Sequence, residues 1–288
     1  MVLETELSPM LLKTREEIFD HPDYIYEIKW DGFRCLAHKG EDYTALVSRN
    51  GWLMDANFPE IMAALKQCAR PVVLDGELVV LWGDRGDFSL LQGRSRLRSP
   101  EKIQAAARKY PATLLVFDIL RLDGRDVTRQ PLMTRKKYLA DLLAAGSAMI
   151  NLPWVEGEGR ALFEAARRAG HEGVVAKRKT SIYRPGARTG DWLKIKHWRE
   201  ETTIITGYKL QPEFGLLVTR PGKAVSTVRQ GIGPEERTAF LTVAQDLITD
   251  QKAGVAEIQP FLKCRVQFKE WTNDGRLRHP VFLRFVTD

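Results

Sequence analysis

The segment Glu27-Ile28-Lys29-Trp30-Asp31-Gly32-Phe33, followed directly by Arg34, is the most informative stretch of this sequence. One lysine lies between two acidic residues on an apolar, strand-like run, and a glycine turn and an arginine follow. A lysine kept out of water beside other cations can lose its proton near neutral pH and act as a nucleophile. A nearby arginine is suited to holding phosphate. The segment therefore indicates nucleotidyl transfer through a covalent lysine intermediate. From four residues alone, a β-hairpin with a surface lysine and an Asp-Gly turn fits about as well.

The composition of the chain indicates a soluble protein with a polyanionic partner. The 288 residues are enough for one large domain or two moderate ones, and a hydrophobic content of 44% supports a real core. The formal net charge of +7 favours nucleic acid, because Lys and Arg neutralise phosphates and release counterions. No secretory signal and no run of membrane-spanning length is visible. We therefore expect a cytoplasmic, nucleoid-associated protein that makes no membrane contact.

The cysteines indicate neither a disulfide framework nor a zinc site. Cys35, Cys68 and Cys264 are far apart, odd in number and form no CxxC pair. A reducing setting fits this pattern best.

The first two-thirds of the chain alternate short strands with amphipathic helices. Runs rich in β-branched, aromatic and leucine residues predict strands over residues 24–30, 45–48, 72–81 and 113–120. Four helices are predicted from their start signals: Asn57 as N-cap with Glu60 as capping-box partner, Ser99-Pro100-Glu101, Thr134, and Leu162 to Ala169 with Gly170 as C′ residue.

After about Arg199 the pattern changes to strands separated by Gly and Pro turns. Strands are predicted over residues 202–210, 216–219, 224–229 and 262–271, with one helix over residues 234–248. Several short strands and one helix in such a length are typical of a small five-stranded OB-type barrel, a fold that commonly binds nucleic acid. We therefore predict an α+β fold in which residues 1–198 form one domain and residues 199–288 form an all-β barrel.

Charged residues recur at strand ends and inside apolar runs. Asp75-Gly76-Glu77 interrupts the predicted strand 72–81, where charges are costly unless they are paired or bound to a cation. Glu77 is therefore a candidate to face a ligand, and a simple bulge or turn at Asp75-Gly76 is the alternative. Lys194 and Lys196 share one strand face, where a phosphate between them would turn repulsion into binding. An exposed edge strand protected by lysines is the alternative there.

Six motifs follow one another along the chain: Lys29-Trp30-Asp31-Gly32-Phe33-Arg34, Ser48-Arg49, Asp75-Gly76-Glu77, Phe117-Asp118, Glu172-Gly173-Val174-Val175-Ala176-Lys177 and Trp192-Leu193-Lys194-Ile195-Lys196. In this order they resemble the motif series of ATP-dependent DNA ligases. That family belongs to the covalent nucleotidyltransferases, together with RNA ligases and mRNA capping enzymes. Two further segments, residues 183–192 and 271–282, resemble the ligase portion of bacterial end-joining ligases in particular. The resemblance implies an ATP-grasp-like adenylation (nucleotidyltransferase) domain followed by an OB-fold domain.

The resemblance implies how ATP would be held. Lys29 would be the nucleophile that attacks the α-phosphorus and holds AMP as a phosphoramidate. Glu27 would meet the adenine amino group and Phe117 would stack on the base. Arg34 and Glu77 would contact the ribose.

The resemblance also implies phosphate and metal contacts. Lys194 and Lys196 would grip the α-phosphate. Glu172 and Glu77 would bind a divalent metal, Mg²⁺ or Mn²⁺, which would neutralise charge on the transferring phosphoryl group. Asp31 would support metal or strand-joining chemistry.

Three further segments bear on DNA and on the barrel. Arg49 would hold the 5′-phosphate of the nick. Arg278 lies in the terminal motif, which the family uses to orient pyrophosphate during adenylation. That motif usually continues with Arg-x-Asp-Lys, whereas Val286 stands here in place of the arginine, a departure that concerns adenylation rather than sealing. The basic segment 93–98 predicts a loop that contacts DNA phosphates, and a solvated charged loop is the alternative.

We therefore expect an ATP-dependent DNA ligase that seals 5′-phosphate/3′-hydroxyl nicks in DNA repair or end joining. Its partners would be nicked duplex DNA and other repair or end-joining proteins. An RNA ligase or capping-type nucleotidyltransferase is the alternative enzyme, and a non-catalytic DNA-binding module is the alternative from another class. An NAD-dependent ligase is disfavoured, because no zinc-type set of cysteines follows Lys29.

Overall fold

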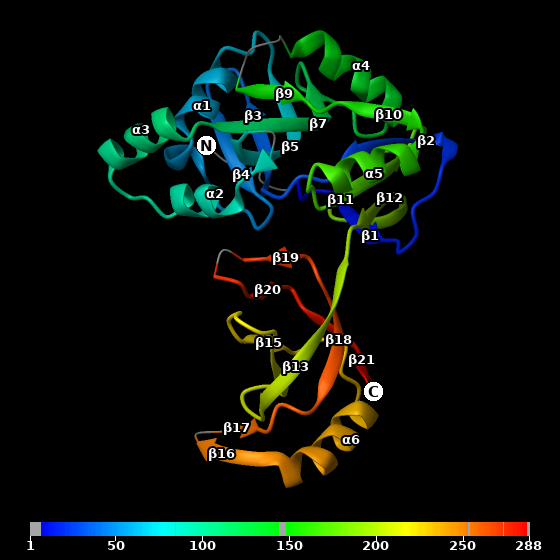
Figure 1. Cartoon of the computed structure of the whole chain (residues 1–288). Coiled ribbons are helices and arrows are strands. Elements are labelled where there is room, and N and C mark those ends of the chain that lie inside the picture. Colours follow the sequence, from blue (N-terminus) through cyan, green and yellow to red (C-terminus); the bar gives the residue numbers. More distant parts are fainter. Residues whose placement is uncertain (1–6, 84, 144–147, 253, 273, 287–288) are drawn as a thin grey trace. The chain divides into compact units, whose positions relative to one another are not determined.

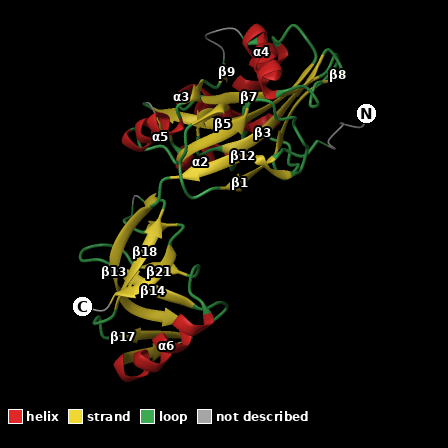
Figure 2. Ribbon diagram, turned by 90° about the vertical axis from the view of Figure 1, so that its right-hand side faces the viewer, coloured by secondary structure: helices red, strands yellow, loops and turns green. Residues whose placement is uncertain are grey.

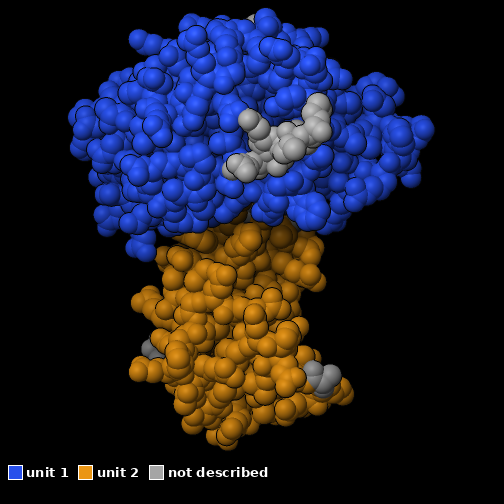
Figure 3. All heavy atoms as spheres, turned by 180° about the vertical axis from the view of Figure 1, so that it is seen from behind, with its two compact units in different colours: residues 1–196 blue, residues 197–288 orange. Residues whose placement is uncertain are grey.

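The computed structural model describes residues 7–83, 85–143, 148–252, 254–272 and 274–286 (Figure 1). The chain forms two compact units, residues 1–196 and residues 197–288, which Figure 3 colours separately. The predicted domains, residues 1–198 and 199–288, divide the chain two residues later, and their separate functions stay predictions.

The first unit contains two main sheets, shown as yellow strands in Figure 2. One sheet has the strand order β1-β12-β11-β2-β10, and its strands are β1 (Leu11–Thr14), β2 (His21–Ile28), β10 (Trp154–Gly157), β11 (Gly173–Arg178) and β12 (Arg188–Lys196). The other has the order β4-β3-β5-β7-β8, with β6 beside β5 and β9 beside β7. Its strands are β3 (Phe33–Lys39), β4 (Thr44–Ser48), β5 (Val72–Trp82), β6 (Arg85–Gly86), β7 (Ala112–Leu122), β8 (Arg125–Asp126) and β9 (Met149–Asn151).

The inner faces of these two sheets share one hydrophobic core, because buried side chains from both sheets pack together. Ile25 and Trp192 come from the first sheet, and Leu36, Val79 and Phe117 come from the second. Helices cover the outer faces. Helix α5 (Gly159–Arg168) packs on β2 and β11, whereas α1 (Pro59–Lys66), α2 (Phe88–Ser95) and α4 (Leu132–Leu142) pack on the second sheet, and α3 (Pro100–Lys109) lies beside α1.

The second unit is a curled sheet with one helix, which agrees with the predicted OB-type fold. Its strand order is β15-β14-β13-β17-β16, and β18 pairs with both β13 and β21. Helix α6 (Pro234–Ala244) buries Phe240 and Ala244 in the core of this unit. Its strands are β13 (Arg199–Lys209), β14 (Gly215–Thr219), β15 (Ser226–Val228), β16 (Ile248–Lys252), β17 (Val255–Ile258), β18 (Lys263–Phe268) and β21 (Val281–Val286), with a separate pair β19 (Glu270–Trp271) and β20 (Leu277–Arg278).

The predicted capping box at Asn57 is wrong. Phe58 occupies the N-cap position of α1 without a side-chain cap. The Asn57 Nδ2 group instead donates to the Leu97 carbonyl at 2.9 Å, and Glu60 pairs with Arg94, whose Nη2 donates to Glu60 Oε2 at 3.1 Å. Both polar side chains are therefore used between elements rather than within their own helix.

Other helix limits shift by a few residues. Helix α4 begins at Leu132 rather than Thr134, and α5 begins at Gly159 rather than Leu162. Helix α6 ends at Ala244, before a short 3₁₀ turn (Gln245–Leu247), rather than at Ile248. The predicted C′ role of Gly170 is confirmed by its φ of +76°.

The predicted basic loop over residues 93–98 is only partly a loop. Residues 93–95 belong to the end of α2, and the Arg94 side chain is buried against Glu60. Arg96 and Arg98 are exposed. Arg94 therefore supports the fold, and the prediction of DNA contact applies only to Arg96 and Arg98.

Within the described ranges, no helix combines the length and the apolar character needed to span a membrane.

Candidate active site

The first unit contains an open cleft of about 870 Å³ whose charged lining is almost entirely positive. Among the described residues that line it, Glu77 is the one acidic side chain. The cationic lining residues come from both sheets and their connections, and they are Lys29, Arg34, Arg49, Arg98, Arg188, Lys194 and Lys196. Such a lining is complementary to phosphate groups.

Lys29 directly follows β2 and is held against the start of β11. Its backbone N–H donates to the Gly173 carbonyl at 2.9 Å. A Cβ atom at Gly173 would lie 2.1 Å from the Ile195 carbonyl oxygen, and the residue has a φ of +147°. Glycine is therefore required at this position, and its compactness lets β2, β11 and β12 lie close together beside the lysine.

Glu172 contacts both Lys29, the predicted nucleophile, and Lys196, one of the two lysines predicted to hold the α-phosphate. Lys29 Nζ donates to Glu172 Oε2 at 2.6 Å, and Lys196 Nζ lies 2.8 Å from Glu172 Oε1. Burial, followed by the charges of Lys196 and Lys29, lowers the pKa of the Lys194 ammonium. One carboxylate thus faces three ammonium groups, which leaves positive charge for an anionic ligand.

A second, smaller cavity adjoins the cleft and shares Lys29, Arg34 and Glu77 with it. Phe117 and Trp192 supply aromatic walls. The cavity measures about 50 Å³, room for only a few water molecules. A purine base would therefore require side chains to move.

Two cationic side chains lie over the ring of Phe117, the residue predicted to stack on the base. The guanidinium carbon of Arg34 lies 4.4 Å from the centroid of Phe117, and Lys177 Nζ lies 4.2 Å from it. Lys177 also lies 4.1 Å from the Trp192 ring. Cation–π contacts of this kind are favourable when the cation is desolvated.

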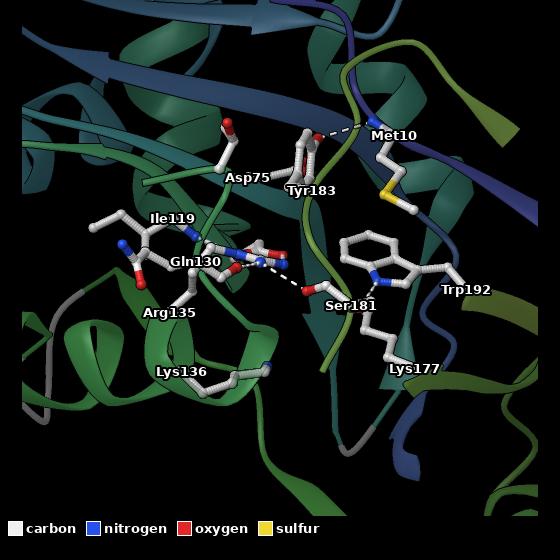
Figure 4. Close-up of polar contacts among 12 residues, drawn as sticks. Met10, Asp75, Ile119, Gln130, Arg135, Lys136, Lys177, Ser181, Tyr183 and Trp192 are labelled. Atoms are coloured by element: carbon white, nitrogen blue, oxygen red, sulfur yellow. Dashed lines mark hydrogen bonds and ion pairs between the residues drawn. The ribbon is translucent and has the colours of Figure 1, made fainter. Parts of the chain in front are cut away.

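Glu27 lines the smaller cavity but is already paired with two lysines. It is 1% exposed, and its carboxylate oxygens contact Lys136 of α4 and Lys177 of β11, the latter at 2.8 Å. Burial lowers the pKa of the Lys177 ammonium to about 8, and the charge of Glu27 only partly offsets this effect. Figure 4 shows that Lys136 and Lys177 come from different elements. Lys136 belongs to no motif of the sequence and was therefore not predicted as a site residue.

Arg34 is fixed by a buried carboxylate. Its Nε and Nη2 groups donate to the two oxygens of Asp75 at 2.5 and 2.6 Å. Tyr183 donates to Asp75 at 2.6 Å and accepts from the Met10 N–H at 2.8 Å (Figure 4). The strand register shifts between Asp75 and Gly76, so the predicted bulge is present and Asp75 also has a specific partner.

Glu77 follows this bulge on β5 and lines both cavities. Burial raises the pKa of its carboxyl to about 7, and the positive charges of Arg34 and Lys29 only partly offset this effect. Asp31 lies near enough to raise the same pKa. Glu77 therefore lies near Lys29, and its predicted contact with a ribose or a metal stays a prediction.

A second buried ion pair supports the strand that carries Phe117. Arg135 of α4 donates from Nε and Nη2 to the carboxylate of Asp118 at 2.7 and 2.8 Å. Its Nη1 donates to the carbonyls of Gln130 and Ser181 (Figure 4). Arg135, like Lys136, lies outside the motifs, and its role is visible only once α4 is placed beside β7.

The remaining predicted site residues lie apart from this cluster or at its edge. Arg49 is exposed, follows β4 and lines the large cleft. Arg278 lies on β20 in the second unit. Val286 lies on β21, the next strand along the chain, which belongs to a different sheet. The roles of Arg49 and Arg278 stay predictions. Thr287 and Asp288 of the terminal motif lie outside the described residues.

Comparison with known proteins gives one consistent result. A family model described as "ATP dependent DNA ligase domain" matches residues 9–196. The bifunctional non-homologous end joining protein LigD of Bacillus subtilis is 31% identical over 286 residues, which cover 91% of this chain and 46% of LigD. DNA ligase C of Mycobacterium tuberculosis is 32% identical over 260 residues, covering 84% of this chain and 71% of that protein.

Solved structures agree with this comparison. The crystal structure of the ligase domain from M. tuberculosis LigD is 28% identical, with a TM-score of 0.62, and the match covers 99% of this chain and 96% of that one. The chain spans about half or less of the full length of the LigD relatives that it matches.

Proposed function

Because this chain belongs to the family of ATP-dependent DNA ligases, we propose that it seals breaks between a 5′-phosphate and a 3′-hydroxyl in duplex DNA. ATP would be cleaved to AMP and pyrophosphate. The observation that carries the proposal is the position of Lys29 Nζ, which lies in a cationic cleft beside Glu172 and next to an aromatic cavity.

The first step of the proposed reaction is adenylation of Lys29. Its Nζ loses a proton and attacks the α-phosphorus of ATP, so that an N–P bond forms and the bond to pyrophosphate breaks. Glu172 Oε2, 2.6 Å away, is the carboxylate within reach of that proton. Lys194 and Lys196 would neutralise the negative charge that the phosphorus oxygens carry in the transition state.

The smaller cavity would bind the nucleoside. Its aromatic wall at Phe117 suits a base, and the Glu27 carboxylate can accept a hydrogen bond from the adenine amino group. Arg34 and Glu77 line both cavities and would meet the ribose between base and phosphate. Entry of the base requires Arg34 or Lys177 to leave the ring of Phe117.

Joining of DNA would follow in two further transfers. The 5′-phosphate of the break attacks the lysine-bound AMP and releases Lys29. The 3′-hydroxyl then attacks the adenylated 5′-phosphate, and AMP leaves. Arg49 on the rim of the cleft would hold the 5′-phosphate, and Asp31 would support this step.

The carboxylates of the site fit a divalent metal of the kind that phosphoryl-transfer enzymes use. Mg²⁺ commonly binds proteins through one or two carboxylates and completes its shell with water and phosphate oxygens. Within the described residues no group of three or more His, Cys, Asp or Glu side chains could hold a metal, so Glu172 and Glu77 would share it with the substrate. When bound, Mg²⁺ or Mn²⁺ supplies positive charge to the transferring phosphoryl group.

The names of several relatives suggest the pathway. LigD proteins of Bacillus subtilis and of mycobacteria are described as non-homologous end joining proteins. We therefore place this chain in end joining or a related repair process, with other repair proteins as partners.

A nick-sealing assay tests this proposal. The wild-type protein with ATP and Mg²⁺ should convert a nicked DNA duplex to a continuous strand, and Lys29→Ala should abolish sealing. Lys66→Ala, an exposed lysine of α1, is the matched control and should seal like the wild type. Parallel duplexes with RNA at the nick separate a DNA ligase from an RNA ligase. Sealing by Lys29→Ala, or preference for RNA, would refute the proposal.

A further inference from the structure

Trp52 is a large apolar side chain exposed in a cleft whose charged lining is almost entirely cationic. It is 73% exposed, and its neighbour Leu53 is 56% exposed, although most tryptophans are largely buried. Both side chains line the same cleft as Lys29. Phe261 is also 70% exposed, but it belongs to the second unit and lines no part of this cleft. Position, rather than exposure alone, therefore distinguishes Trp52.

The turn that carries Trp52 is held in a fixed conformation. Gly51 has a φ of +83°, and its N–H donates to the Ser48 carbonyl at 2.9 Å. The Trp52 N–H donates to Ser48 Oγ at 3.0 Å, and the Ser48 N–H donates to the Trp52 carbonyl at 2.8 Å. Leu53 forms a bridge with Val47. The indole is thus displayed on a rigid support rather than on a loose loop.

This turn is joined to the segment that follows Lys29. The N–H of Arg49 donates to the carbonyl of Arg34 at 3.2 Å, and Ser48 pairs with Cys35 across β3 and β4. The backbone therefore ties the indole to the nucleotide-binding residues. Trp52 lies in the same turn as Arg49, the residue proposed for the 5′-phosphate.

The chemistry of the surface selects its occupant. A ligand that suits both parts must carry several negative charges for the cations and an apolar face for the indole. Nucleic acid has both, because phosphates alternate with sugars and bases, and aromatic side chains commonly pack on them. An acidic protein segment would satisfy the cations but would offer little to the indole.

We propose that Trp52 packs against a nucleotide of the DNA beside the 5′-phosphate of the break, with Leu53 extending the same apolar contact. This inference rests on the proposed ligase function and adds a residue that belongs to no motif of the sequence. The contact is apolar, so its loss should weaken binding without changing the number of phosphates neutralised.

Binding of a nicked DNA duplex, measured at several salt concentrations, tests the inference. Trp52→Ala should bind about tenfold more weakly at every salt concentration, with an unchanged slope of log Kd against log [salt]. Trp52→Phe should recover most of the affinity. Arg98→Ala, which removes a cation of the same cleft, should instead reduce the slope by about one. Phe261→Ala is the control for an exposed aromatic and should bind like the wild type.

The outcomes separate this inference from the proposed function. Unchanged affinity of Trp52→Ala, in a wild-type background that seals nicks, would overturn the contact and leave the ligase function intact. A loss of affinity that Trp52→Phe fails to recover would also overturn it, because it would indicate damage to the turn. If the wild-type protein seals no DNA, the proposed function itself fails.

Discussion

At the scale of single residues, the site contains more lysine ammonium groups than carboxylates to pair with them. Lys29 and Lys196 both pair with Glu172, and Lys136 and Lys177 both pair with Glu27. Each carboxylate thus holds two ammonium groups inside or at the edge of a binding cavity. Such clusters cost free energy in the absence of ligand and can be neutralised by phosphate.

The cost is clearest at Lys177, and it predicts a specific pH dependence of stability. Burial lowers the pKa of this ammonium to about 8, from 10.5 for a free side chain. Between these two pH values the unfolded chain binds the proton and the folded protein does not, so stability rises with pH. The free energy of unfolding of the wild type, relative to Lys177→Met, should therefore increase from pH 8 to pH 10.5.

Chemical denaturation at a series of pH values measures this difference. The contributions of titratable groups present in both proteins cancel in the difference between their free energies of unfolding. For Lys66→Met, at an exposed lysine, this difference from the wild type should stay constant with pH. A constant difference for Lys177→Met over the same pH range would contradict the lowered pKa.

At the scale of elements, sequence patterns located the strands better than the partners of polar side chains. The predicted strands over residues 72–81 and 113–120 are found as β5 and β7. They could be predicted because an apolar, β-branched run is a signal contained within the strand itself. The capping box at Asn57 failed, because its signal is local while the Glu60 carboxylate is taken by Arg94, 34 residues away. Lys136 and Arg135 were missed for the same reason, since their partners lie on distant strands.

The Arg135–Asp118 pair predicts a strong effect on stability at this scale. Both side chains are fully buried, and the guanidinium also donates to two backbone carbonyls. Arg135→Met would leave the Asp118 carboxylate buried without its partner, which typically costs about 3–5 kcal/mol. The exposed pair Arg160–Asp20 is the control, and Arg160→Met should cost less than about 1 kcal/mol.

Urea denaturation of both variants measures these costs. A loss at Arg135→Met no larger than that at Arg160→Met would show that the buried pair does not anchor α4 to β7.

At the scale of the whole molecule, the order of the motifs in the sequence indicated the family, whereas the distances between the site residues became visible only in the fold. The sequence predicted an α+β unit followed by an OB-type unit, and the compact units divide two residues from the predicted boundary. It also placed Lys29, Glu172, Lys194 and Lys196 in one site, which long-range strand pairing then brings together. The small size of the aromatic cavity and the exposure of Trp52 could not be predicted, because both depend on side-chain packing across elements.

Identification of the residue that carries AMP tests the central claim most directly. The protein is incubated with ATP labelled at the α-phosphate and Mg²⁺ without DNA, and the labelled peptide is sequenced by mass spectrometry. We predict one acid-labile adduct on Lys29, absent from Lys29→Ala and chased onto DNA when a nicked duplex is added. An adduct that persists in Lys29→Ala, or no adduct on a wild-type protein that seals DNA, would contradict the proposed mechanism.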